Sequence, residues 1–217
     1  MGHNSTKLYL EYYAKMLLET LYPDRYMEII KGESPDLHMS NGHGVEVTWA
    51  MFENQGQAGG ILNHIKGKEV DKIDQRYLKT MRRIHTELIF DADGKICGYI
   101  PIDAKNKANY TDIIKAYEQK KIKKYKTKHT DLFIYPPLAQ LDGWLGENII
   151  KECCDVISND PENPFRNIFI FEEPTLYRFS IHNKVFQSKR GAQEQIMQCK
   201  KAADVYSGWS KRKKDIE

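Results

Sequence analysis

Apolar residues recur every three or four positions over residues 5–22, which predicts a first amphipathic helix that ends before Pro23. The same spacing predicts helices over 110–126, 144–157 and 189–206, and a weaker helix over 61–81. Shorter apolar runs predict strands over 27–30, 37–39, 45–49, 87–90, 96–100, 132–135, 168–171 and 177–181. Turn-forming residues at 40–44 and 91–95 predict two hairpins, and 52–60 is expected to be a loop. This order of elements predicts an α/β protein with a mixed sheet flanked by helices.

Length and composition limit the class of protein. The 217 residues are 41% hydrophobic, which is enough for a single domain, 1–217, with its own core. No apolar run approaches the ~20 residues of a membrane span, and the N-terminus lacks the pattern of a signal peptide. The four cysteines form no CxxC pair, which argues against a zinc site or a disulfide framework. The expectation is a cytoplasmic protein with no membrane partner.

Charge is unevenly distributed along the chain. The formal net charge is only +3, but residues 104–128 contain nine lysines and two acidic residues. A second basic run occupies 211–214. A local excess of positive charge suits a phosphate-bearing partner such as nucleic acid. The alternative is a solvated helix face and a frayed C-terminal tail.

Two carboxylates fall close together in the first predicted hairpin. With a turn at 40–44, residues 39 and 45 pair, so that Asp36 lies opposite Thr48 and diagonal to Glu46. Two carboxylates on one face repel each other, and Glu46 in an otherwise apolar strand is costly to bury alone. A hard divalent cation would satisfy both groups. The alternative is that Glu46 faces solvent and Asp36 caps a turn.

The order of motifs points to a known family. A helix, Pro35-Asp36, a strand with Glu46-Val47-Thr48, a lysine-rich helix and an apolar strand follow one another. Over about residues 8–135 this arrangement resembles the PD-(D/E)xK nuclease superfamily and its restriction-endonuclease-like fold. The resemblance implies an αβββαβ core over about 5–50 and 110–136, an insertion over about 52–108, and a C-terminal α/β extension over about 140–210. It also implies a divalent-metal-dependent nuclease that hydrolyses phosphodiester bonds in DNA.

The resemblance assigns roles to particular acids. It implies that Asp36 and Glu46 bind Mg²⁺ or Mn²⁺, with the Val47 carbonyl as a further ligand. It also implies an acid from the first helix, for which Glu11 is the better candidate and Glu19 the second. Both acids are equally compatible with ordinary surface positions.

The motif lysine of the family is absent, because position 48 is Thr. In the family this lysine positions the attacking water and stabilises charge that builds on the phosphate. Some members take the lysine from the following helix instead, which makes Lys121 and Lys124 the catalytic candidates here. Lys121 continues the apolar stripe of the helix expected over 110–126, so it should lean toward the sheet. The neighbouring lysines are expected to contact nucleic-acid backbone: Lys120, Lys123 and Lys126.

Two other interpretations stay open. The chain could be a catalytically inactive member that binds nucleic acid or a protein partner, since position 48 carries no charge. It could also be a small structural or interaction protein in which the Pro-Asp and Glu-Val pairs are coincidental. A homodimer is compatible with the resemblance, but no residue marks an interface.

Overall fold

The computed structural model describes residues 3–50, 53–84, 86–101, 108–136 and 146–208. The chain divides into two compact units. Unit 1 comprises Met1–Ala50 and Ile113–Glu217, and unit 2 comprises Met51–Asp112. The two units are described separately below, and the candidate site lies entirely in unit 1.

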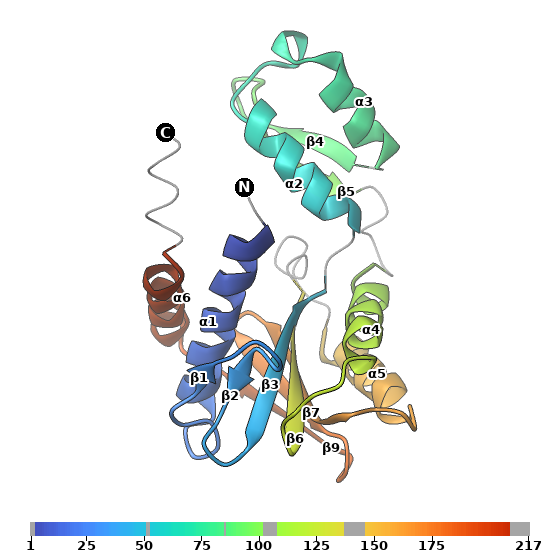
Figure 1. Cartoon of the computed structure of the whole chain (residues 1–217). Helices are drawn as coiled ribbons and strands as arrows, with labels where there is room; N and C mark the ends of the chain where they lie inside the picture. The colour runs from blue at the N-terminus through green and yellow to red at the C-terminus, as the bar shows by residue number, and fades with distance from the viewer. Residues whose placement is uncertain (1–2, 51–52, 85, 102–107, 137–145, 209–217) are drawn as a thin grey trace. The chain divides into compact units, whose positions relative to one another are not determined.

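Unit 1 is built on one mixed sheet of seven strands in the order β1-β2-β3-β6-β7-β8-β9. Strand β3 is parallel to β6 and β6 is parallel to β7, and every other neighbouring pair is antiparallel. The strands are β1 (Ile30–Lys31), β2 (Leu37–His38), β3 (His43–Trp49), β6 (His129–Tyr135), β7 (Phe165–Glu172), β8 (Thr175–Ser180) and β9 (Val185–Arg190). The expected α/β class with a mixed sheet is confirmed. Strands β7 to β9 extend the same sheet that carries β3 and β6 (Figure 1).

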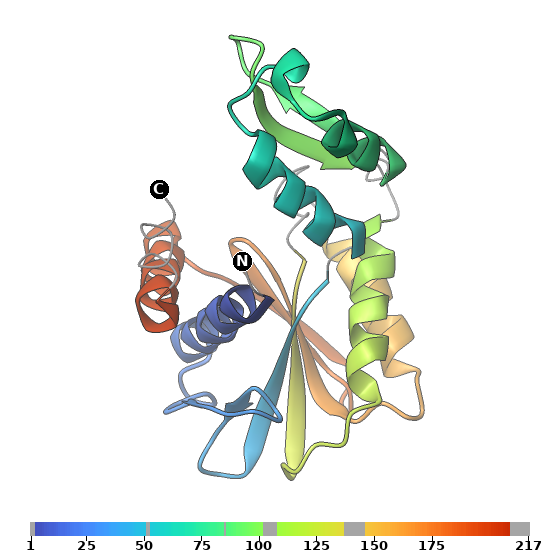
Figure 2. The same ribbon diagram turned by 45° about the horizontal axis from the view of Figure 1, so that its top comes forward.

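Helices cover both faces of this sheet. Figures 1 and 2 show α1 (His3–Leu21) and α6 (Gln193–Ser207) on one face, and α4 (Ala108–Lys121) and α5 (Gly146–Ser158) on the other. On the α1 face, side chains of α1 and α6 form one buried cluster with Val45, Val47 and Phe169. Because side chains alternate along a strand, residues 46 and 48 of β3 face α4. On that face the Tyr117 ring meets the Phe165 ring edge-on, with centroids 6.1 Å apart.

Unit 2 packs two helices against a two-stranded sheet. Its elements are α2 (Glu53–Ile65), the short 3₁₀ turn η1 (Val70–Lys72), α3 (Gln75–Arg83), β4 (Thr86–Phe90) and β5 (Ile96–Pro101). The hairpin expected around 91–95 is confirmed by the antiparallel pairing of β4 with β5. Its core includes Ala58, Ile61 and Ile65 of α2 and Met81 of α3.

Several expected elements were wrong in type or length. Residues 53–60 of the expected loop are instead the first half of α2, which was missed because three glycines and several polar residues there give the sequence no helical periodicity. The helix expected over 61–81 is interrupted after Ile65, and Gly67 in the turn that follows has a φ of 78° that an L side chain rarely adopts. A new helix, α3, starts after Asp74, whose side chain accepts the Arg76 N–H at 2.9 Å.

Strand β9 was not expected, and residues 189–190 were assigned to the last helix. Five of its six residues are exposed and they show no apolar alternation. The strand forms because its backbone pairs with β8 at the sheet edge, so that α6 begins later, at Gln193. Among the described helices, none is both long and apolar enough to cross a membrane.

Candidate functional site

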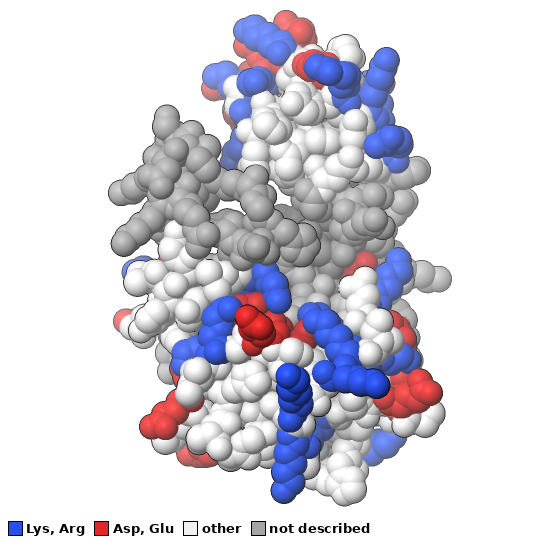
Figure 3. Space-filling view, in the orientation of Figure 1, with Lys and Arg blue, Asp and Glu red and all other residues white. Residues whose placement is uncertain are grey.

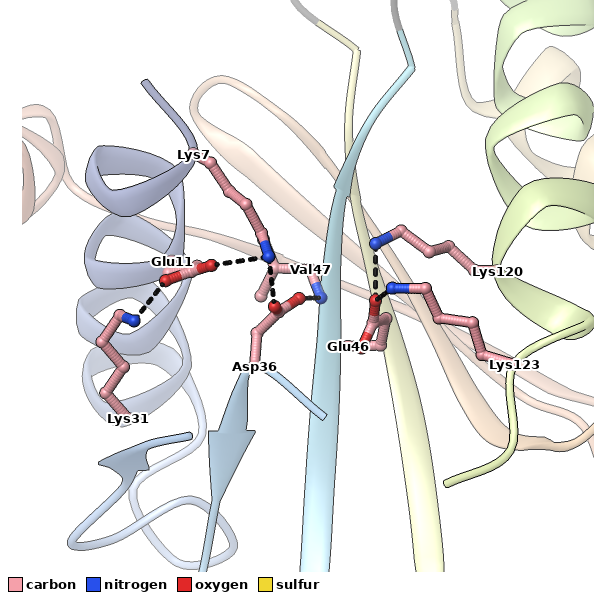
Figure 4. Close-up of polar contacts among 8 residues, drawn as sticks. All are labelled: Lys7, Glu11, Lys31, Asp36, Glu46, Val47, Lys120 and Lys123. Carbon is pink, nitrogen blue, oxygen red and sulfur yellow. Dashed lines mark hydrogen bonds and ion pairs between the residues drawn. The ribbon is translucent and has the colours of Figure 1, made fainter. Parts of the chain in front are cut away.

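Three carboxylates are buried in unit 1 near the start of β2, beside β3. Glu11 of α1 is 3% exposed, Asp36 just before β2 is 1% exposed, and Glu46 of β3 is 0% exposed. Four lysines contact them, two from each side of β3 (Figure 4). We call these seven residues the carboxylate cluster: Lys7, Glu11, Lys31, Asp36, Glu46, Lys120 and Lys123.

Asp36 is placed by the register of the first hairpin. Leu37 pairs with Val45, two residues away from the expected register, so Asp36 comes level with Glu46 rather than with Thr48. The expectation that Asp36 and Glu46 point to one face is nevertheless wrong. Asp36 lies just outside β2 and its carboxylate pairs with Lys7 of α1, whereas Glu46 faces α4 and pairs with Lys120. Asp36 Oδ2 accepts the Val47 N–H at 2.8 Å. The carboxylate thus takes the place of the backbone carbonyl that a longer β2 would offer to this N–H.

The Val47 carbonyl lies at the same edge of β3 as Asp36. In an extended strand the N–H and C=O of one residue point to the same neighbour, and the Val47 N–H points to Asp36. Tight packing holds the preceding proline over the strand. A Cβ built at Gly44 would lie 2.2 Å from Pro35 Cγ, so only glycine leaves room for Pro35-Asp36 here.

On the α1 side of the cluster, one ammonium joins two acids. Lys7 Nζ lies 3.3 Å from Glu11 Oε1 and 3.0 Å from Asp36 Oδ1, while Lys31 Nζ lies 3.1 Å from Glu11 Oε2. Burial raises the pKa of Glu11, and the Lys31 ammonium partly opposes this shift. Burial lowers the pKa of Lys7, but the carboxylates of Asp36 and Glu11 outweigh it and raise the pKa above its ordinary value.

On the α4 side, two ammonium groups share one carboxylate oxygen. Lys120 Nζ and Lys123 Nζ lie 2.5 Å and 2.8 Å from Glu46 Oε1. Glu46 Oε2 is buried and has no hydrogen-bond partner among the described residues. Burial lowers the pKa of Lys120 below its ordinary value, although Glu46 opposes the shift. Glu46 therefore has one heavily shared oxygen and one oxygen that lacks a donor.

The lysines at Glu46 are not the ones expected as catalytic. Lys121 Nζ instead lies 2.9 Å from Glu118 Oε2 and 2.8 Å from Asp160 Oδ2. Lys124 and Lys126 are exposed, and neither forms an ion pair with a carboxylate in the described part of the chain. The expectation that Lys121 or Lys124 leans toward the site is wrong in geometry, and Lys120 and Lys123 occupy that place.

The physical reason is where α4 ends. The helix was expected to continue to residue 126, but it stops at Lys121, and the Tyr125 hydroxyl folds back to donate to the Lys120 carbonyl at 2.8 Å. Lys123 then lies in the turn and reaches β3. The buried stripe of α4 runs through Ile113, Ala116 and Tyr117, and the next position on that stripe is Lys120. The sequence prediction took Tyr117 and Tyr125 as the ends of the buried stripe, which placed Lys121 on it. Extending the stripe from Ile113 in helical steps would instead have identified Lys120.

The remaining site residues also have defined places. Glu11 lies in the cluster, whereas Glu19 does not, because its Oε1 accepts from Lys15 Nζ at 2.6 Å and from the Ile29 N–H at 3.0 Å. Sequence reasoning missed Lys7 and Lys31. The signal for Lys7 was its position four residues before Glu11 on one helix face.

The donor set can be tested for a metal ion. No group of three or more His, Cys, Asp or Glu side chains in the described ranges is arranged to hold one. Asp36, Glu46 and the Val47 carbonyl nevertheless fit a hard cation, because they are oxygen donors and Glu46 Oε2 is a buried anionic oxygen without a partner. The lysines that now balance these carboxylates would have to move aside for such an ion.

Figure 3 shows acidic atoms on this face of unit 1 with lysine or arginine side chains on either side of them. The cluster therefore combines oxygen donors with neighbouring positively charged side chains, which suits an anionic substrate held next to a cation.

Searches of protein-family models, of curated proteins and of solved structures find no match to this chain.

Proposed function

We propose that this protein is a divalent-metal-dependent nuclease that hydrolyses phosphodiester bonds in DNA, on a restriction-endonuclease-like core. The observation that supports this most directly is Glu46, which is fully buried, has a donor-free Oε2, and lies level with Asp36. Burying a carboxylate oxygen without a hydrogen-bond donor costs free energy. A protein that keeps such an oxygen therefore often uses it in a functional site. The match of Pro35-Asp36 and Glu46-Val47 to the motif of the PD-(D/E)xK superfamily supports the same conclusion.

In this proposal Asp36, Glu46 and the Val47 carbonyl hold Mg²⁺ or Mn²⁺. When bound, such an ion lowers the pKa of a coordinated water and neutralises charge on the phosphate. Lys120 replaces the lysine that is missing at position 48. Its ammonium sits in a partly water-excluded position, where a charge stabilises a developing phosphorane more strongly than in bulk water.

The other lysines position the substrate and the acids. Lys123 is more exposed than Lys120 and can reach either Glu46 or a backbone phosphate. Lys7 orients Asp36 and Glu11 on the α1 side, and Glu11 retains Lys7 close to Asp36. The exposed Lys124 and Lys126 remain candidates for contacts to nucleic-acid backbone.

A second candidate is a catalytically inactive protein that binds nucleic acid through the same surface. It is favoured by the lysines, because each buried carboxylate of the cluster already has an ammonium partner without any metal. Thr48 carries no charge and cannot replace the motif lysine. Such a binder would keep its affinity for DNA in EDTA, whereas the nuclease requires the metal for turnover.

The deciding experiment is cleavage of supercoiled plasmid and of labelled single strands in Mg²⁺, in Mn²⁺ and in EDTA. Wild type is compared with Asp36→Asn and Glu46→Gln, which keep side-chain shape and remove charge. Asp155→Asn is the matched control, since Asp155 is an exposed acid of α5 in the same unit. We expect metal-dependent cutting that falls by at least about hundredfold in both site variants and is unchanged in the control.

Cutting that survives in both Asp36→Asn and Glu46→Gln would overturn the assignment of the site. Folded wild-type protein that binds DNA in EDTA and never cuts would support the inactive binder instead. Thermal unfolding of each variant separates loss of activity from loss of fold.

A further inference from the structure

A second charged site lies elsewhere in unit 1. A cavity of about 460 Å³ is lined by three arginines, two histidines, a serine and an asparagine. We call it the arginine pocket, and the residues that matter for its chemistry are Arg25, His129, Arg166, Arg178 and His182. No acidic residue lines it among the described residues, and no large apolar side chain does either.

The pocket is separate from the carboxylate cluster. His129 pairs with His43 at the start of β3 and β6, whereas Phe133 pairs with Val47 four residues further along. Four residues of strand span roughly 13 Å. Arg178 lies on β8, three strands away from β3 in the sheet order. The two sites share no residue.

A buried chain of hydrogen bonds positions one of the arginines. The Tyr26 hydroxyl and Asn167 Nδ2 donate to the two oxygens of Asp131, which is 2% exposed. Arg178 Nε and Nη2 in turn donate to Asn167 Oδ1 at 3.1 Å and 3.0 Å. The guanidinium is thus fixed by a neutral amide, and its charge is not cancelled by direct contact with a carboxylate.

The other two arginines have no partner of opposite charge. Neither Arg25 nor Arg166 forms an ion pair within the ranges that the structure describes, and Arg25 Nη2 is a buried atom without a hydrogen-bond acceptor there. The nearest carboxylate in this network is Asp131, behind Arg178. The three guanidinium groups therefore leave an excess of two positive charges around the cavity.

We infer that the arginine pocket binds a phosphate dianion, as inorganic phosphate or as a terminal phosphate monoester. A dianion balances the excess charge, and its three terminal oxygens suit three guanidinium groups that can each donate two hydrogen bonds. All seven lining residues are polar or charged, so the charge of the phosphate would supply most of the affinity. The inference rests on this pocket alone and does not require nuclease activity.

Titration of the full-length protein with inorganic phosphate at constant ionic strength tests this inference. Heat of binding and thermal unfolding are measured for wild type, for Arg25→Gln/Arg166→Gln and for Arg166→Gln alone. Arg190→Gln is the matched control, because Arg190 is an exposed arginine of β9 outside the pocket. Each lost guanidinium should weaken phosphate binding by about tenfold or more, while Arg190→Gln should change nothing.

Sodium chloride replaces phosphate in a parallel titration, and a rise in unfolding temperature of equal size there would overturn the inference. Equal phosphate affinity in wild type and in Arg25→Gln/Arg166→Gln would also overturn it, as would no binding by folded wild type. If the double variant fails to fold, Arg166→Gln decides, since the Arg166 side chain is exposed.

A short DNA strand with and without a 5′-phosphate identifies the source of the phosphate. If the occupant is a strand terminus, only the 5′-phosphorylated strand displaces inorganic phosphate from the pocket. If neither strand displaces it, the occupant is a small free phosphate.

Discussion

The carboxylate cluster and the arginine pocket lie in one unit but balance their charges differently. In the cluster every lysine contacts a buried carboxylate, and Lys7 contacts two. In the pocket no arginine forms an ion pair with a carboxylate among the described residues, and Asp131, which lies behind Arg178 in the hydrogen-bond network, accepts from Tyr26 and Asn167. The carboxylates of the cluster thus have counter-charges without a ligand, although Glu46 Oε2 lacks a hydrogen-bond donor. The pocket lacks its counter-charge and should gain stability when an anion binds.

The largest effect is expected from Asp131→Ala, in the hydrogen-bond network that positions Arg178 of the pocket. Removing the carboxylate leaves the Tyr26 hydroxyl and the Asn167 amide as buried donors without acceptors, which should cost about 3 kcal/mol of unfolding free energy. Urea unfolding measures the effect. Asp131→Asn keeps side-chain volume and one acceptor, so it should lose less. A loss below about 1 kcal/mol in Asp131→Ala would show that Arg178 is positioned in some other way.

In the cluster, Lys120→Met should have the next largest effect, on turnover rather than on fold. If Lys120 stabilises charge on the scissile phosphate, cleavage should fall by about hundredfold, equivalent to about 2.7 kcal/mol of transition-state stabilisation. Affinity for DNA in EDTA should change only about threefold, because one phosphate contact among several is lost.

Lys121→Met is the matched comparison for Lys120→Met, because the two lysines are neighbours on α4 but only Lys120 contacts Glu46. Its ammonium is paired with Glu118 and Asp160 and not with Glu46, so cleavage should stay within about threefold of wild type. Single-turnover rates and DNA affinities of both variants are measured side by side. Equal losses of turnover in Lys120→Met and Lys121→Met would contradict the assignment of Lys120.

Gly44→Ala tests how the hairpin holds Asp36 in the cluster. The new Cβ would overlap Pro35 Cγ and crowd the Leu37 carbonyl, so Pro35-Asp36 must shift, at a cost of roughly 2 kcal/mol. Metal-dependent cleavage should fall with stability, while phosphate binding in the arginine pocket should persist. Gly60→Ala is the control, because nothing lies within 4 Å of a Cβ built there. Unchanged cleavage and stability in Gly44→Ala would show that Pro35 moves freely.

The smallest effect is expected from Asp160→Asn, which removes one of the two carboxylate partners of Lys121. Hydrogen bonds from Lys121 and Tyr117 lower the pKa of Asp160 to about 2, from an ordinary value of 3.8. A lowered folded-state pKa stabilises the fold above pH 4, and this contribution is lost as the pH falls through about 2. Solvent screening should keep it under about 1 kcal/mol.

Thermal unfolding of wild type and Asp160→Asn at pH 5 and at pH 2 checks this sign. The difference in unfolding temperature should be present at pH 5 and nearly absent at pH 2. A difference that grows on acidification would contradict the lowered pKa of Asp160.

The spacing of apolar residues in the sequence correctly predicted the elements that bury one apolar stripe. It located α1, α5, β6 and both hairpins, because each has a period long enough to recognise and clear turn or capping residues. It failed at α2, whose first half is rich in glycine and polar residues, and at β9, which has no apolar alternation and exists through pairing with β8. Elements that depend on a neighbour leave little periodicity in their own sequence.

The same division applies to the candidate site. By itself the sequence determined the mixed α/β class and the presence of Asp36 and Glu46 in one hairpin, because the turn at 40–44 brings the segments that carry them together. It did not predict the register, or that the two carboxylates turn to opposite sides of β3. Helix spacing marks Lys7 and Lys120 as neighbours of their buried stripes, but only the tertiary structure decided which lysines reach those acids. Lys7, Lys31, Lys120 and Lys123 come from three separate segments, and their arrival at β3 depends on where α4 ends and how α1 packs on the sheet. Contacts between distant segments are set by packing and chain termination, which no local period encodes.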